Sequence, residues 1–516
     1  MSYRTAIQRA SAMLSRQVQW QHPMVVRGGI DQTRLSITKC DFEQNCESTI
    51  KKLNQDAFSF VVMGDTDFGE SKGWSQSQFA EMFAEQMEKQ IERSQLLLHT
   101  GDVTYPVGSY QNYYSGFLRP YRSLFSQSPN VTSDYTGDDL SNVVFNKPVL
   151  PVPGNHDYAQ LPFWPRLCQQ LARFWYGTLL RIFRFKVNRL GGQGGEAYGQ
   201  IFLDDLEKLS PKALKQHLMA HYSAQLDTIL EPETNNINLI ETGEPTYCLS
   251  YVPGQFTRLP NRYYTFSYQS IDFFALDSNT WNMSPESPGF DQAQLDWLED
   301  GLVQSWRSPH SLGRILYLHH SPYTTERIRW QQPETLWVRR HLRQVLDNVK
   351  ARLVPEADWL DNNPLVNLVI SGHAHCLEHI KTKQTGHGDA NIDWLVCGGS
   401  GLDLRRQRSS GSQILESLTV EGCSTTELVA ESVLYAGLHG QKEKKQHFHS
   451  FVRIDVPPGD LRRLVICPFV VVKGRFGWQT NALDPIVVGG FLKSRSQLRD
   501  IKSSERLHRY RLSARA

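Results

Sequence analysis

The stretch Pro148-Val-Leu-Pro-Val-Pro-Gly-Asn-His-Asp157 joins a short apolar run to a polar cluster. Runs this short, when they are rich in branched and aromatic residues, indicate buried strands. The same succession recurs from residue 57 onward, and helical spacing of apolar residues separates several of the runs, so the sequence predicts an α/β fold. The predicted strands are Phe58–Met63, Leu96–His99, Pro148–Val152, Ile271–Leu276, Ile315–Leu318 and Leu365–Ile370.

A polar cluster follows five of these predicted strands. Ligands of open α/β sheets bind outside the carboxyl ends of strands, so we expect one shared site built from loops that are far apart in the chain. The clusters contribute carboxylates, an amide and imidazoles, a mixture that suits first-row transition metals better than Ca²⁺ or Mg²⁺. They are Gly64-Asp65-Thr66-Asp67, Gly101-Asp102-Val103-Thr104-Tyr105, Gly154-Asn155-His156-Asp157, His319-His320-Ser321-Pro322 and Gly372-His373-Ala374-His375.

The rest of the chain organises around this pattern. Helices are predicted at 75–93 and at 291–306, the second beginning at Asp291, a suitable N-cap. No convincing strand is visible between 159 and 246, which we interpret as an insertion. The predicted organisation begins with an N-terminal extension (1–56) and a core (57–401) that contains the insertion (159–246). A polar and irregular connection (402–445) follows. The C-terminal part (446–492) completes the core with predicted strands at Phe448–Val456 and Leu464–Val472, and a basic tail (493–516) ends the sequence.

Composition narrows the class of protein. The chain has 516 residues, 40% of them hydrophobic, which fills a sizeable core and excludes a mainly disordered chain. A formal net charge of +2 argues against a dedicated nucleic-acid binder. No apolar run reaches the roughly 18 residues of a membrane-spanning helix, no secretory signal peptide is visible, and the eight cysteines form no CxxC pair. We therefore expect a cytoplasmic protein with reduced thiols.

The order of the clusters resembles that of a known family. The succession GD, GDxxY, GNHD, HxP and GHxH is similar to the motifs of the calcineurin-like metallophosphoesterases, over roughly residues 57–401 with the insertion set aside. The segment Asp291-Gln-Ala-Gln-Leu-Asp-Trp-Leu298 is a second shared feature. Tyr105, three residues after Asp102, resembles the tyrosine of the purple acid phosphatase branch. The resemblance implies a four-layer αββα sandwich with a largely helical insertion after the GNHD motif.

The resemblance also implies a site for two metal ions. Asp102 would bridge them; the other ligands would be Asp65, Tyr105 and His375 for the first ion, and Asn155, His320 and His373 for the second. The implied ions are Fe(III) with Fe(II), Zn or Mn, and two Mn ions are an alternative. They would lie roughly 3.5–4 Å apart and share a hydroxide that attacks the phosphorus of a phosphate monoester in line.

Several positions leave alternatives. In the family the histidine at His156 faces the phosphate and protonates the leaving group or stabilises charge, and Asp157 either orients its ring or caps a helix. Asp67 stands where many family members carry a histidine, and it is either a metal ligand or a neighbour of one. The pattern His-x-Pro selects His320 rather than His319, which would then point to the opposite side of the strand end.

Two segments are strongly basic. Residues 161–190 carry six Lys or Arg, no acid, and aromatic residues at helical spacing. This composition is typical of a helix that packs on or caps the catalytic body and, as an alternative, of a helix that contacts an acidic membrane. The tail 493–516 carries eight basic and two acidic residues, and it is either a solvated tail or a contact for acidic lipid or nucleic acid.

The favoured function is therefore a dinuclear metal-dependent phosphohydrolase that acts on a phosphorylated small molecule. A phosphodiesterase or nucleotide hydrolase on the same site is the alternative, because monoester and diester centres share ligands. A second alternative is a non-catalytic scaffold or membrane-associated binding protein of the same fold, favoured by the two basic segments. No dedicated nucleic-acid binding is expected.

Overall fold

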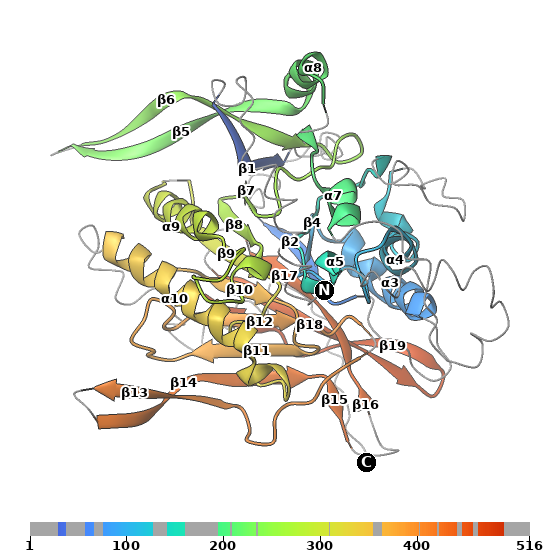
Figure 1. Ribbon diagram of the computed structural model, residues 1–516. Coiled ribbons are helices and arrows are strands. Elements are labelled where there is room, and N and C mark those ends of the chain that lie inside the picture. The colour runs from blue at the N-terminus through green and yellow to red at the C-terminus, as the bar shows by residue number, and fades with distance from the viewer. Residues whose placement is uncertain are drawn as a thin grey trace, which may run out of the picture.

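The protein is described here by a computed structural model (Figure 1). The two basic segments 161–190 and 493–516, and Asp67, lie outside the described residues, so the expectations attached to them stay predictions. The structure describes residues 29–37, 57–66, 76–126, 142–159, 195–206, 209–233, 236–308, 310–353, 364–401, 403–420, 423–440, 446–457 and 463–489.

The larger sheet has eleven strands in the order β13-β14-β11-β12-β10-β9-β8-β7-β1-β6-β5. Its centre, β8-β9-β10-β12, is parallel, and both ends are antiparallel hairpins. The strands are β1 (Ile30–Ile37), β5 (Tyr222–Glu233), β6 (Asn236–Tyr251), β7 (Tyr264–Tyr268), β8 (Ile271–Leu276), β9 (Gly313–Leu318), β10 (Leu368–Ser371), β11 (Leu377–Thr382), β12 (Asp393–Cys397), β13 (Gln413–Val420) and β14 (Cys423–Ala436).

The smaller sheet has seven strands, in the order β19-β18-β17-β2-β3-β4 with β20 beside β18. The neighbours β2, β3 and β4 are parallel, so their carboxyl ends meet at one edge. The strands are β2 (Phe58–Met63), β3 (Leu96–His99), β4 (Val149–Pro151), β17 (His449–Val456), β18 (Leu464–Gly474), β19 (Gly477–Ala482) and β20 (Ile486–Val488), and a separate pair is formed by β15 (Leu438–His439) and β16 (Gln446–His447).

Alternation along the central strands creates two cores. In β9, Ile315 and Tyr317 belong to the core between the sheets, whereas Leu316 and Leu318 belong to the core under the helices. Both sets are fully buried, as expected for a strand covered on both faces. Burial of each such side chain contributes about 1.5–3 kcal/mol to folding.

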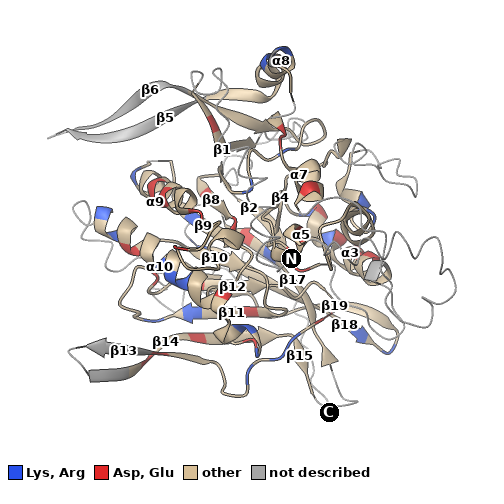
Figure 2. Ribbon diagram, in the orientation of Figure 1, with Lys and Arg blue, Asp and Glu red and all other residues tan. Residues whose placement is uncertain are grey.

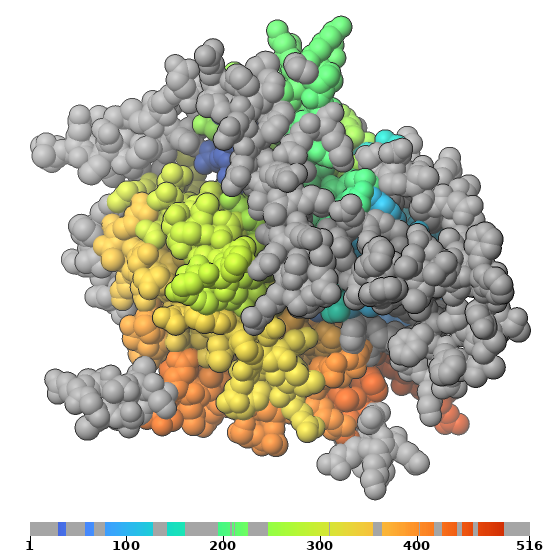
Figure 3. Space-filling model, in the orientation of Figure 1, coloured from blue at the N-terminus to red at the C-terminus, as the bar shows by residue number. Residues whose placement is uncertain are grey.

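Helices form the two outer layers. On the larger sheet, α9 (Gln292–Arg307) and α10 (Pro333–Leu353) bury one face each and show charged residues of both signs on the other (Figure 2). Figure 3 shows these helices, in yellow-green to yellow, on the surface of the molecule. On the smaller sheet, α3 (Gln76–Glu92) buries Phe79, Phe83 and Met87. This layering is the predicted αββα sandwich, and further helices are α4 (Tyr110–Tyr113), α5 (Asn155–Tyr158), α7 (Glu196–Phe202) and α8 (Pro211–His221).

The predicted strands and helices of the core are confirmed, with shifts of a few residues at some ends. The strands predicted at Phe58–Met63, Leu96–His99 and Ile271–Leu276 coincide with β2, β3 and β8. Asp291 caps α9 as expected, because its carboxylate accepts a hydrogen bond from the backbone N–H of Gln294. None of the helices within the described ranges combines the length and apolar character needed to cross a membrane.

The prediction for residues 159–246 is wrong in one respect. Its described residues contain helices α7 and α8, but also β5 and most of β6, which pair with each other and, through β6, with β1. The described part of the insertion, from residue 195 onward, is therefore not largely helical, and β1 draws part of the N-terminal extension into the sheet. The reason is that β6 contains Asn, Glu, Gly and Pro, so it lacks the apolar run by which the core strands are visible.

The prediction of an irregular connection at 402–445 is also wrong. Strands β13 and β14 form an antiparallel hairpin, and β14 pairs with β11 to extend the larger sheet. The hairpin is only partly covered: Val429 is buried, whereas Val433 is about half exposed. A strand with one open face needs apolar residues only at alternate positions, so its composition is close to that of a loop.

Candidate metal centre

The five polar clusters meet at one place, and both sheets contribute to it. Asp65, Asp102 and Asn155 follow β2, β3 and β4 of the smaller sheet. His319 and His320 follow β9 of the larger sheet, and His373 and His375 lie in the turn between β10 and β11. Because all these strands end at the same edge, side chains that are up to 310 residues apart in sequence (375 − 65) are brought together.

The backbone at three of these positions is unusual. Asp65, Asp102 and His373 have φ angles of 56°, 51° and 65°, in the left-handed region that non-glycine residues seldom adopt. Residues held this way cluster at functional sites, where the surrounding structure offsets a cost of about 1–3 kcal/mol each. The main chain at Gly154 packs directly against Asp102, so that a Cβ at this position would lie only 2.1 Å from the backbone nitrogen of Asp102. The main chain itself therefore fixes where the carboxylates lie.

Asp102 is the most connected acceptor of the site. Its carboxylate accepts hydrogen bonds from the Tyr105 hydroxyl at 2.6 Å and from the His156 backbone N–H at 2.8 Å, and lies 3.3 Å from Nε2 of His319. The Tyr105 hydroxyl also lies 2.9 Å from Oδ1 of Asp65. The predicted bridging residue thus contacts Tyr105 of the first predicted half and His319, which was not among the predicted ligands.

Asp65 connects the clusters on the two sheets. Its Oδ2 accepts a hydrogen bond from the backbone N–H of His373 at 2.9 Å, and its Oδ1 lies 3.6 Å from Nε2 of His375. The other ring nitrogen of His375 lies 2.8 Å from the carbonyl oxygen of Asp403. That carbonyl can only accept, so Nδ1 carries the proton and Nε2 presents its lone pair to Asp65 and its neighbours.

The expectation that His319 points to the opposite side of the strand end is wrong. Its ring is fully buried inside the cluster, with Nε2 2.9 Å from Oδ1 of Asn155 and 3.1 Å from Nδ1 of His373. Its Nδ1 lies 2.9 Å from the carbonyl oxygen of Thr100. The His-x-Pro pattern alone did not reveal this residue.

His320 lies beside this cluster. Its Nδ1 lies 2.9 Å from the Ser278 hydroxyl, and its Nε2 lies 3.3 Å from Nδ2 of Asn282. Ligand atoms of His319, His320 and His373 nevertheless all lie within 4.8 Å of one another, as do those of Asp65, Asp102 and His319. Two donor groups that share His319 are thus available for cations.

The electrostatics of the cluster favour cation binding. Burial raises the pKa of Asp65 to about 7, with the charge of Asp102 adding to the effect. Burial opposes a charge on His319, but Asp102 raises its pKa to about 9, and His319 in turn holds the pKa of Asp102 below its usual range despite burial. A proton on His319 thus partly neutralises two crowded carboxylates, which is the role that a metal ion performs at such sites.

The remaining imidazoles are suited to ligation. Burial, followed by the positive charge of Arg329, lowers the pKa of His373 well below its usual value and that of His375 to about 3. Neutral imidazole is the form that binds metals. Nε2 of His373 is buried and has no hydrogen-bond partner among the described residues. Such an orphaned nitrogen, beside a mixed oxygen and nitrogen donor set, fits a transition-metal site.

Comparisons with known proteins agree with this geometry. The family model described as calcineurin-like phosphoesterase matches residues 58–377, more than half of the chain. The chain belongs to the calcineurin-like phosphoesterase family.

Two solved structures are similar at low identity. A purple acid phosphatase, PPD1, from yellow lupin (Lupinus luteus) seeds is 13% identical with a TM-score of 0.42, and the match covers 84% of this chain and 54% of that chain. GAP50, the anchor in the inner membrane complex of Plasmodium, is 12% identical with a TM-score of 0.35. This match covers 85% of this chain and 90% of the GAP50 chain. The chain thus spans about half the length of the lupin enzyme. No curated protein matches it.

In this family member, the side chains of His156 and Asp157 each contact other groups. Nδ1 of His156 lies 2.8 Å from the carbonyl oxygen of Pro106, and its ring lies 4.3 Å from that of Tyr105. The buried carboxylate of Asp157 accepts hydrogen bonds from the Gly154 backbone N–H at 2.8 Å, the Val103 backbone N–H at 3.1 Å and the Tyr113 hydroxyl at 2.7 Å. Of the two alternatives for Asp157, these contacts support helix capping.

Replacing Asp157 with alanine is expected to lower the free energy of unfolding by about 2–4 kcal/mol, because three buried donors lose their acceptor. Chemical denaturation measures the effect, and Asp484→Ala, at an exposed carboxylate, is the control. If Asp157→Ala keeps its stability but changes the pH profile of catalysis, Asp157 acts on His156 instead.

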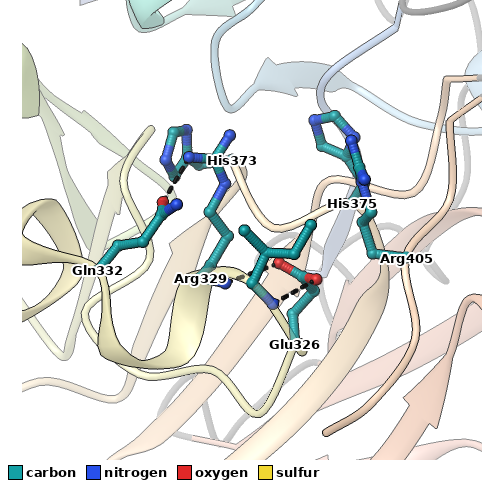
Figure 4. A pocket seen from close by; sticks show the side chains of 7 residues that line it. Glu326, Arg329, Gln332, His373, His375 and Arg405 are labelled. Atoms are coloured by element: carbon teal, nitrogen blue, oxygen red, sulfur yellow. Dashed lines mark hydrogen bonds between the residues drawn. The ribbon is translucent and has the colours of Figure 1, made fainter.

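A small cavity beside the ligands contains residues that the motifs did not reveal. Its volume is about 100 Å³, and Figure 4 shows His373 and His375 at one end with Arg329, Arg405 and Glu326 around it. Ile328 and Gln332 complete the lining. Arg329 follows the HHSP cluster and Arg405 follows GHAH by thirty residues, so neither belongs to a motif. The only signal in the sequence is that basic residues occur in loops after the clusters.

Proposed function

We propose that this phosphoesterase-family protein is a dinuclear metal-dependent phosphohydrolase that hydrolyses phosphate monoesters. The single observation that carries the proposal is the convergence of Asp65, Asp102, Asn155 and His373 on one buried cluster from both sheets. Tyr105 lies between the two carboxylates, which supports a purple acid phosphatase-like centre of Fe(III) with Fe(II), Zn or Mn. When bound, the ions would lower the pKa of an attacking water and neutralise charge on the phosphate.

Each protein group has a role in this proposal. Asp102 holds both halves of the centre; Asp65, Tyr105 and His375 form one half, and Asn155 and His373 form the other with His320, His319 or both. The backbone N–H of His156 donates to Asp102 and keeps that carboxylate in one orientation.

His156 is the proposed proton donor to the leaving group. The carbonyl oxygen of Pro106 accepts a hydrogen bond from the Nδ1–H of His156, so Nε2 is the nitrogen proposed to exchange a proton during the reaction. The ring is partly exposed, in contrast to the buried imidazoles of the cluster. It can therefore reach a substrate that the cluster itself holds.

Removal of metal is expected to abolish hydrolysis of p-nitrophenyl phosphate, because the proposed mechanism needs a metal ion to lower the pKa of the attacking water. Treatment with a chelator, followed by assay and elemental analysis, measures this. Addition of Mn²⁺, Zn²⁺ or Fe²⁺ is expected to restore activity with about two ions per chain. Full activity in metal-free protein would overturn the proposal, and faster hydrolysis of bis(p-nitrophenyl) phosphate would assign a diesterase.

A further inference from the structure

The cavity beside the cluster has two cationic walls. Arg329 lies on the His373 side and Arg405 on the His375 side (Figure 4). Both arginines are partly exposed, so they reach solvent while they line the cavity. The carboxylate in this lining, Glu326, is fully buried below them. The guanidinium of Arg405 also pairs with the part-exposed carboxylate of Asp403 at 2.5 Å, and that of Arg329 donates to the Gln332 side chain, so two anchored guanidinium groups lie next to the imidazoles.

The two arginine-bearing loops are tied to each other. Glu326 and Gln407 form an isolated antiparallel bridge. The Arg327 backbone N–H donates to the carbonyl of Arg406 at 2.8 Å, and the Arg408 N–H donates to the carbonyl of Thr325 at 2.8 Å. These bonds hold the loop after β9 against the loop after β12, so the spacing of the two backbone segments that carry Arg329 and Arg405 is fixed.

Each arginine is also tied to the site. The carboxylate of Glu326 accepts the backbone N–H groups of Ile328 at 2.9 Å and Arg329 at 3.0 Å, which fixes the turn that carries Arg329. The backbone N–H of Arg405 donates to the carbonyl of His375 at 2.9 Å. The buried carboxylate of Glu326 therefore shapes the turn that carries Arg329, and its charge also interacts with both arginines.

We propose that Arg329 and Arg405 bind the terminal oxygens of the substrate's phosphate and thereby make the site prefer phosphate monoesters to diesters. The proposal rests on the proposed hydrolysis of phosphate esters and deepens it. These two residues are specificity-determining residues of the reaction, distinct from the ligands.

The chemistry of the two ester classes supports this choice. A monoester has three terminal oxygens and about two negative charges at neutral pH, whereas a diester has two terminal oxygens and one charge. Guanidinium groups bind phosphate oxygens through paired, charge-assisted hydrogen bonds. A pair of arginines beside the centre can bind the additional oxygen and charge of the monoester. The second ester substituent of a diester would have to occupy the same small cavity.

The test compares Arg329→Gln and Arg405→Gln with the parent protein on two esters. We expect each variant to lower kcat/KM for p-nitrophenyl phosphate by about 10- to 100-fold, the usual loss for a charged hydrogen bond. For bis(p-nitrophenyl) phosphate we expect kcat/KM to change by no more than about threefold. The ratio of kcat/KM for the monoester to kcat/KM for the diester therefore falls. Arg→Lys variants keep the charge without the paired geometry and should lie between. Equal losses on both esters, or no loss, would overturn the inference.

A binding measurement separates this inference from the proposed function. Calorimetric titration of inorganic phosphate into the metal-loaded protein should show at least about tenfold weaker binding in both Gln variants, with unchanged metal content. Arg327→Gln and Arg406→Gln change the same charge on the same loops outside the cavity, and should bind phosphate like the parent. If the parent hydrolyses neither ester, the proposed function fails while phosphate binding still tests the arginine pair; unchanged binding in the Gln variants rejects the pair.

Discussion

Replacing Asp102 with asparagine is expected to lower kcat/KM for p-nitrophenyl phosphate on the order of 1000-fold and to reduce the bound metal. The substitution keeps the size of the side chain and an oxygen that can accept from the Tyr105 hydroxyl or the His156 N–H. It removes the negative charge that lies 3.3 Å from His319 and that the centre needs for cation binding. The loss should therefore appear in catalysis and metal content before it appears in folding.

Asp300→Asn is the matched control for this experiment. The Asp300 side chain is 61% exposed and pairs with Arg352 on the surface, so its loss should leave kcat/KM and metal content unchanged. Elemental analysis, steady-state kinetics and thermal unfolding are measured on both variants. An Asp102→Asn protein with parental activity would refute the proposed mechanism.

Replacing His319 with alanine is expected to lower kcat/KM by at least about 100-fold, although the His-x-Pro pattern selects its neighbour. Nε2 of His319 lies within 3.3 Å of Asn155, His373 and Asp102, and the imidazole is fully buried. Its removal leaves crowded carboxylates without a compensating group, which costs stability and metal affinity together.

The companion variant His320→Ala tests the neighbour. Because ligand atoms of His319, His320 and His373 lie within 4.8 Å of one another, we expect this variant also to lose at least half of its bound metal. His310→Ala, at an exposed imidazole, controls for loss of a histidine. If His319→Ala keeps parental metal content and activity while His320→Ala loses both, His320 alone serves the centre.

Much of the core and of the candidate site could be predicted because one physical rule governs both. A buried parallel strand must be apolar, and the loop that follows it is polar and lies at the sheet edge, so the position of Asp65, Asp102 or Asn155 is visible as an abrupt change in the sequence. The side of His319 was predicted wrongly for a related reason. Alternation holds only within a strand, and β9 ends at Leu318, so the next two rings are not forced to opposite faces.

The parts that the sequence did not reveal are those without a sharp apolar pattern. The hairpin of β13 and β14 has one open face, and β6 is long and polar, so both have the composition of loops. Arg329 and Arg405 were missed because their proximity depends on backbone bonds between two loops rather than on any spacing. Such contacts exist only once the chain has folded.

The division of the ligands between two sheets has a further consequence for cohesion. Asp65 and Asp102 belong to the smaller sheet, whereas His319 and His373 belong to the larger one. An ion bound by both sets is a cross-link between the two halves of the sandwich, and the halves cannot separate without releasing it. At a free ion concentration 1000 times its dissociation constant, such a cross-link adds about 4 kcal/mol to the unfolding free energy. That is a large share of the roughly 5–15 kcal/mol that holds a typical domain together, so metal supply would govern how long the folded protein persists.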